Sequence, residues 1–137
     1  MRQMEKAVID AVKQSFGRAL SNKSMMGDFY NVLISKHPDI AKKFAGADLK
    51  KQQEVLKQSL SMAILFPQDN VIAKHAMDRV RGTHSHDKLN INPELYKHWL
   101  DALMSVVAQS DPEFTPQLEQ HWRSVLTHAI DYIKAGY

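Results

Sequence analysis

The sequence predicts an all-α domain of about six or seven helices joined by short connections. Apolar residues recur three or four positions apart along nearly the whole chain, whereas no segment alternates cleanly between apolar and polar residues. The Asn-Gly and Asp-Gly pairs that favour tight β-hairpins do not occur. The 137 residues, 44% of them hydrophobic and 24% charged, suffice for one core but not for two. We therefore expect a single domain, residues 1–137, whose helices cross at steep angles around one core.

Three helices are predicted in the first third of the chain. The first ends at the polar segment Ser21-Asn22-Lys23-Ser24, where Ser24 is placed to cap the second. Pro38, in the segment His37-Pro38-Asp39, suits the first position of a short third helix. The residues expected to face the core are Val8, Val12, Phe16 and Leu20 in the first helix and Phe29, Tyr30, Leu33 and Ile34 in the second.

Two further helices are predicted between Asp48 and Gly82. Asp48 is a candidate N-cap, and Pro67 ends the helix that follows it. Asp69 or Asn70 begins a shorter helix, which we expect to end near Gly82. The longer helix carries one clean stripe of core-facing residues, which consists of Leu49, Gln52, Leu56, Leu60 and Ala63.

The last third of the chain predicts two long helices. Asn92 caps the first of them, with Pro93 at its first position, and the segment Ser110-Asp111-Pro112 ends it. Thr115-Pro116 begins the last helix. The stripes expected to face the core are Leu95, Trp99, Leu103 and Val106, and then Leu118, Trp122, Val125, Ala129 and Ile133.

Composition excludes several classes of function. The net charge of +3 is spread along the chain, so we expect neither a nucleic-acid surface nor a nucleic-acid partner. The chain has no cysteine, which excludes disulfides, thiolate catalysis, iron–sulfur clusters and Cys-ligated zinc, and which favours the cytoplasm. The first residues carry charges every few positions and do not resemble a signal peptide. No stretch is apolar enough to span a bilayer, so no membrane partner is expected either.

Motifs for hydrolysis, phosphate binding and dinucleotide binding are absent, which leaves the seven histidines as candidates for chemistry. His121 and His128 are seven positions apart and share a helix face, but no third zinc ligand is in register with them. His84 and His86 would point roughly 200° apart on a continuous helix, so they cannot hold one ion together. His86 lies just past Gly82, at the start of a segment from which its ring can point into a pocket between helices.

Two polar residues on core-facing stripes add to this pattern. Tyr30 and Gln52 stand where an apolar residue would be the simpler choice. A buried hydroxyl or amide without a hydrogen-bond partner costs about 1–3 kcal/mol. Each of them therefore either bonds to a nearby carbonyl or points at a bound ligand.

At these positions the chain resembles a globin, most closely the bacterial single-domain and flavohaemoglobin-type globins. Tyr30 and Phe44 fall on the distal tyrosine and the phenylalanine that packs on the porphyrin, and Gln52 and Leu56 fall on the distal glutamine–leucine pair. The spacing of His86, Ile91 and Tyr96 is similar to that after the proximal histidine, which favours His86 over His84. Trp99 matches a distal tryptophan of truncated globins, although their paired-glycine motifs are missing. The resemblance covers about residues 5–133 and implies a globin fold of six to eight helices around a haem pocket.

The resemblance implies haem b (iron protoporphyrin IX) as cofactor, with His86 as the iron ligand. The haem would pack against Phe44, Leu56, Leu60, Ile91, Tyr96 and Val107. Lys74, Arg79 and Arg81 are candidate partners of the haem propionates, and solvated surface charge is an equal alternative for them.

The function that the resemblance implies is reversible binding of O₂, and also of CO and NO. Tyr30, Gln52 and Trp99 would donate hydrogen bonds to the ligand beside Leu56 and raise the affinity for O₂, which suits oxygen transport or NO detoxification. The 137 residues contain no reductase domain, so NO dioxygenase or peroxidase-like activity would need an external reductase. The alternative is a gas- or redox-sensing module that acts through a partner.

Overall fold

The computed structural model describes residues 5–137, and in this range it consists of helices and turns with no strand. Its seven α-helices are α1 (Lys6–Leu20), α2 (Met25–Lys36), α3 (Pro38–Phe44), α4 (Leu49–Leu65), α5 (Val71–Thr83), α6 (Tyr96–Ser110) and α7 (Pro116–Lys134). Two short 3₁₀ helices, η1 (Phe66–Gln68) and η2 (Pro93–Leu95), precede α5 and α6. The predicted all-α class is therefore confirmed.

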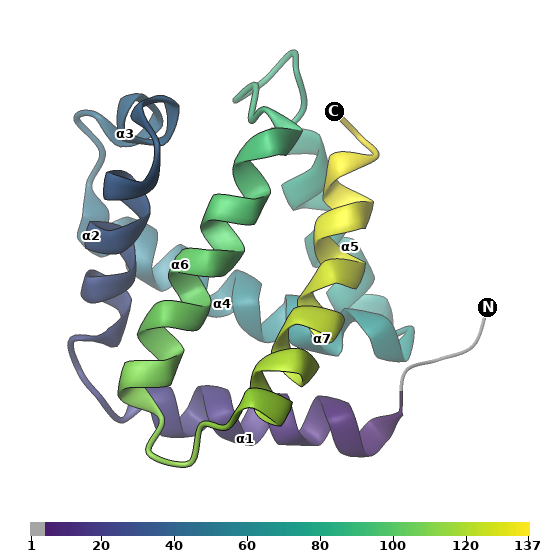
Figure 1. Cartoon of the computed structure of the whole chain (residues 1–137). Coiled ribbons are helices and arrows are strands. Elements are labelled where there is room, and N and C mark those ends of the chain that lie inside the picture. The colour runs from purple at the N-terminus through teal and green to yellow at the C-terminus, as the bar shows by residue number, and fades with distance from the viewer. Residues whose placement is uncertain (1–4) are drawn as a thin grey trace.

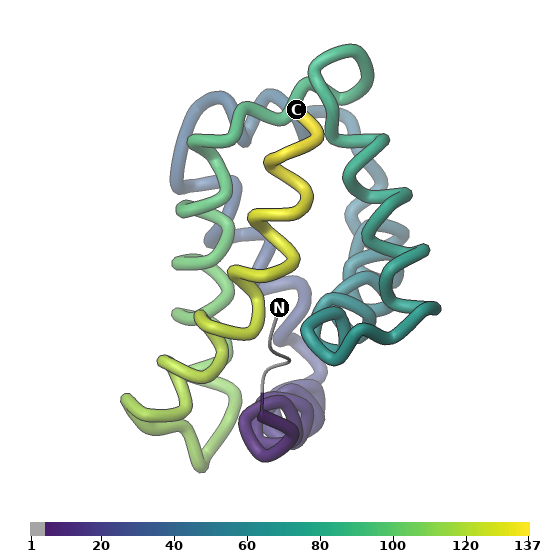
Figure 2. Tube along the Cα trace, turned by 90° about the vertical axis from the view of Figure 1, so that its right-hand side faces the viewer, coloured from purple at the N-terminus to yellow at the C-terminus, as the bar shows by residue number. Residues whose placement is uncertain are grey.

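The helices cross one another rather than running as a parallel bundle (Figure 1). The most extensive contacts are those of α2 with α6, α1 with α7, α2 with α3, and α4 with α5, and α5 also packs on α7. Viewed from the side, α5 and α6 lie on opposite sides of α7 (Figure 2). By contrast, α6 has little direct contact with α4 or α5. The described residues include no helix long and apolar enough to cross a membrane.

Side-chain caps fix most helix starts where the sequence predicts them. The Asp48 carboxylate accepts from the N–H of Lys51 at 3.3 Å at the start of α4, and Asn70 accepts from Ala73 at 2.9 Å at the start of α5. At the start of α7 the Thr115 hydroxyl accepts from the N–H of Leu118 at 3.1 Å. Such caps satisfy backbone donors that have no partner inside the helix.

The starts and ends of α2 and α5 agree with the predicted positions, and one predicted cap is missing. Ser24 precedes α2 as expected, but its hydroxyl donates to the Asn22 side chain and makes no cap bond. The α5 helix ends at Thr83, next to Gly82, and the N–H of His84 still bonds to the Val80 carbonyl at 3.0 Å. This hydrogen bond places His84 directly at the end of α5.

The core contains one buried polar group of residues, which joins α1 to the segment between α6 and α7. Asp111 is 2% exposed and Ser15 is fully buried. The Asp111 carboxylate accepts from the Ser15 hydroxyl at 2.6 Å and from Nε and Nη2 of Arg18 at 2.7 and 3.1 Å. Trp122 donates its indole N–H to the Ser15 oxygen at 2.9 Å. Each buried polar atom in this group therefore has a partner, as burial requires.

Candidate functional site

Tyr30 lies where α2, α3 and α4 meet. It is 4% exposed, and its hydroxyl donates to the backbone carbonyl of Gln52 at 3.1 Å. Its ring meets the Phe44 ring edge-on, with centroids 5.4 Å apart. Burial raises the pKa of Tyr30 to about 12, so the phenol remains a hydrogen-bond donor at neutral pH. Of the two partners that the sequence left open for this hydroxyl, the carbonyl is the one it bonds in this structure.

Gln52 is joined to Tyr30 through its backbone carbonyl, and Trp99 is linked to Tyr30 through the ring of Phe29. The side chain of Gln52 is half-buried, and its amide makes no hydrogen bond within residues 5–137. Trp99 packs edge-on against Phe29 with centroids 5.9 Å apart, and Phe29 packs on Tyr30 at 5.2 Å. Of the predicted ligand-binding residues, Tyr30 therefore contacts Phe44 and the backbone of Gln52, whereas Trp99 contacts Phe29.

The two neighbouring histidines lie in different surroundings. His84 ends α5 and is half-buried, with Nδ1 3.1 Å from the Thr83 hydroxyl oxygen. Burial lowers the pKa of His84, and a hydrogen bond with the Val80 carbonyl opposes that shift. His86 has a side chain that is 65% exposed, with Nδ1 3.6 Å from the Asp87 carboxylate. Of these two histidines, only His84 has a partly covered ring, and its lowered pKa favours the neutral imidazole, the form that binds metals.

The loop after α5 is held by its own hydrogen bonds. The N–H of Ile91 donates to the His84 carbonyl at 3.2 Å, so Ile91 lies beside His84 rather than His86. The N–H of His86 donates to the Tyr137 carbonyl at 3.1 Å, and the His86 ring packs edge-on against Tyr137 at 5.6 Å. Tyr137 also donates its hydroxyl to the Asn90 side chain at 2.6 Å, and Asn90 has a left-handed backbone with φ of 53°. His86 is therefore engaged with Tyr137 on the surface.

The predicted haem-packing residues divide into two groups. Leu60 and Val107 are 1% and 0% exposed, so they belong to the closed core. Phe44, Leu56 and Tyr96 pack against the core but remain partly exposed, and so does Val80, which was not predicted from the sequence. Ile91 is also half-buried. Burial raises the pKa of Tyr96 to about 12. Val80 could have been found from its position one helical turn before His84.

Two of the three candidate propionate partners are engaged elsewhere. Lys74 forms an ion pair with Asp78 at 3.1 Å, and the Arg81 guanidinium lies 4.7 Å from the centroid of the Tyr132 ring. Arg79 is exposed. Lys43, which the sequence analysis did not single out, bridges α3 to the loop after α5 by donating to the Leu89 carbonyl at 2.8 Å.

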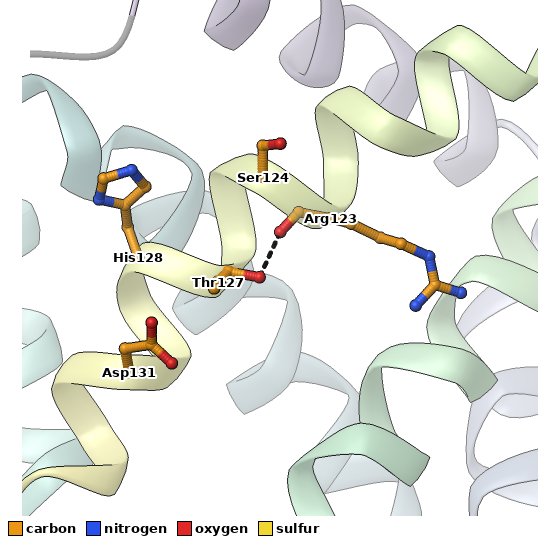
Figure 3. A pocket seen from close by; sticks show the side chains of 5 residues that line it. All are labelled: Arg123, Ser124, Thr127, His128 and Asp131. Carbon is orange, nitrogen blue, oxygen red and sulfur yellow. Dashed lines mark hydrogen bonds between the residues drawn. The ribbon is translucent and has the colours of Figure 1, made fainter.

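Two shallow hollows lie on the surface. One, of about 470 Å³, is on α7 and is lined by Arg123, Ser124, Thr127, His128 and Asp131 (Figure 3). The other, of about 330 Å³, lies between α3 and the loop after α5 and includes Lys42, Lys43 and Asn92. His128 lines the first hollow, but no group of three or more metal-ligating side chains occurs among the described residues. The zinc pair considered from the sequence thus gains no third ligand there.

Comparison with known proteins decides the family. The sequence model of the globin family matches residues 27–133. The chain belongs to the globin family. Its structure is similar to the crystal structure of the protein PA3967 from Pseudomonas aeruginosa PAO1, described as structurally highly homologous to a human haemoglobin. The two share 32% sequence identity over 95% of this chain and 98% of that one, with a TM-score of 0.90. No curated protein matches the chain.

The residues of this globin fit a haem. Globins hold a haem and bind diatomic gases such as O₂. Here a half-buried histidine with a lowered pKa ends α5, and apolar side chains of α3, α4, α5 and α6 remain only partly covered. The limited contact of α6 with α4 and α5 agrees with this arrangement. A flat apolar porphyrin with one open iron position is complementary to such a set of side chains.

Proposed function

We propose that this globin binds haem b through His84 and reversibly binds O₂, CO or NO on the side of Tyr30 and Gln52. The observation that carries this proposal is the half-buried His84 ring at the end of α5, with the Ile91 backbone beside it. Haem iron supplies the position at which a diatomic gas binds. The protein supplies an imidazole oriented by Thr83 and Val80, apolar side chains that keep water away, and donors near the ligand.

A spectrum of the purified protein tests the proposal. The protein, as isolated or after addition of hemin, is expected to show a Soret band that shifts when the reduced sample is exposed to CO. A colourless protein that cannot be reconstituted with hemin would defeat it.

The donors near the ligand indicate tight rather than loose binding of O₂. A hydrogen bond to a charged acceptor is worth about 1.5–3 kcal/mol, against about 1 kcal/mol for a neutral pair. Tyr30 gives up its bond to the Gln52 carbonyl when it donates to a ligand, so the net gain is about 0.5–2 kcal/mol. The half-buried Gln52 amide has no such bond to give up within the described residues. Retention of O₂ suits NO detoxification, with an external reductase supplying electrons, better than oxygen delivery.

We predict that Tyr30→Phe speeds O₂ dissociation by about two- to thirtyfold, which is the range that the net gain converts to at 1.4 kcal/mol per decade. Stopped-flow displacement of O₂ by CO measures this rate. Tyr96→Phe is the matched control, because burial raises the pKa of Tyr96 to about 12 as it does for Tyr30, but Tyr96 is assigned to the haem wall and not to the ligand side. An O₂ dissociation rate that is the same in wild type and Tyr30→Phe would remove Tyr30 from the proposal.

We place this activity in the cytoplasm, because the chain lacks cysteine. A sensing role would act through the same haem. It would require a partner whose binding changes with the gas, and no feature of the described surface favours it over O₂ chemistry.

A further inference from the structure

Tyr132 on α7 contacts four groups from the segment between η1 and the end of α5. Its hydroxyl donates to the Asp78 carboxylate, and Lys74 Nζ lies 3.5 Å from the same hydroxyl. Its ring packs against the Phe66 ring, with centroids 5.1 Å apart, and against the Arg81 guanidinium at 4.7 Å. One side chain of α7 thus contacts η1 and three successive turns of α5.

The three α5 residues in this group share one face of the helix. At 100° per residue, Lys74, Asp78 and Arg81 lie within about 60° of one another, and their face is about a quarter turn from that of His84. The contact with Tyr132 therefore fixes the rotation of α5 about its own axis without occupying the side that carries His84. Because α6 has little contact with α5, the helices that hold this rotation are mainly α4 and α7.

We propose that Tyr132 is a positioning residue for His84: it holds α5 at the rotation that directs the His84 ring toward the haem iron. This inference rests on the proposed function of His84. A ligand must be held to within about 10–20° of its working orientation, and a helix fixed on one side only does not provide that. The same geometry assigns Lys74 and Arg81 to the contact between α5 and α7, and not to the haem propionates.

Tyr132→Phe is the direct test, because it removes the hydroxyl and keeps the ring contacts with Phe66 and Arg81. In the reduced, gas-free protein, the iron–histidine stretching band in the resonance Raman spectrum is expected to shift or broaden. Transfer of haem to an acceptor apoglobin is expected to be about tenfold faster, as fits the loss of one hydrogen bond to a charged group. In the haem-free protein, amide hydrogen exchange in residues 71–83 is expected to rise.

Two further variants sharpen the test. Asp78→Ala is expected to reproduce the Tyr132→Phe effect, and the double variant is expected to add little, because both changes break the bond between Tyr132 and Asp78. The ion pair with Lys74 that Asp78→Ala also removes is exposed and contributes little. Arg123→Gln is the matched control: it removes the ion pairs of Arg123 with Asp101 and Glu119, each at 3.0 Å, from the part of α7 that faces α6. This control is expected to leave the iron–histidine band and the exchange of residues 71–83 unchanged.

If Tyr132 has a purely structural role, Tyr132→Phe lowers the melting temperature, as Arg123→Gln does, but leaves the iron–histidine band at its wild-type position. That result would overturn the inference. If wild type has no iron–histidine band that depends on His84, the proposed function itself fails and the inference fails with it. The two failures are distinguished by the wild-type spectrum.

Discussion

The His84→Ala variant is expected to lose its haem, whereas the His86→Ala variant is expected to retain it. His84 is half-buried at the end of α5, next to Val80 and Ile91, and its lowered pKa keeps the ring neutral. His86 is 65% exposed and packs on Tyr137. Because loss of a group that merely orients a metal ligand already costs 10- to 100-fold in affinity, loss of the ligand itself should speed haem dissociation by more than about a hundredfold.

Haem transfer to an acceptor apoglobin, followed at the Soret band, measures this difference. A His84→Gly variant supplied with free imidazole offers a second measurement, since the added imidazole is expected to restore the spectrum of the wild-type protein. Loss of haem from His86→Ala together with retention in His84→Ala would restore the assignment made from the sequence.

The sequence-based preference for His86 depended on its spacing to Ile91 and Tyr96, whereas the proposal of His84 depends on its place at the end of α5. The helical period predicts which residues share a face only as far as the helix continues. Because α5 runs to Thr83, His84 shares the face of Val80 and Met77. His86 lies beyond that end, in a loop whose path is set by hydrogen bonds and not by a period.

The residues proposed to face the gas ligand were easier to predict from the sequence, because they lie on helices with clear apolar stripes. The structure places Tyr30 against Phe44 and the Gln52 backbone, and the sequence could not choose between the bond from Tyr30 to this carbonyl and a bond to a ligand. The basic residues of α5 could not be assigned from the sequence. Their partner Tyr132 is more than fifty positions away, and a charge on a helix face does not reveal what covers it.

The second large effect is expected at Asp111, which is remote from the proposed haem site. Burial alone would raise the pKa of Asp111, but the hydrogen bonds from Arg18 and Ser15 outweigh it and hold the pKa below its ordinary value. Removing one partner of a buried ion pair costs about 3–5 kcal/mol. Because the Arg18 side chain is 27% exposed and can turn to solvent, Asp111→Ala is expected to lower the free energy of unfolding by an amount near the lower limit, about 3 kcal/mol.

The same group of residues predicts how stability depends on pH. A carboxylate whose pKa is lower in the folded than in the unfolded state stabilises the fold above its unfolded pKa of about 3.9, and this contribution is lost as the pH falls through the folded pKa. Urea unfolding of the wild-type protein is therefore expected to show falling stability below about pH 4, and Asp111→Asn should show a shallower fall.

Asp10→Asn is the control, since the ion pair of Asp10 with Lys6 is exposed and screened by water. Equal pH dependence in Asp111→Asn and wild type would mean that Asp111 does not carry the acid sensitivity. In that case the contact between α1 and the segment joining α6 to α7 would depend on the packing of Trp122 and Phe16, whose rings meet edge-on at 6.1 Å.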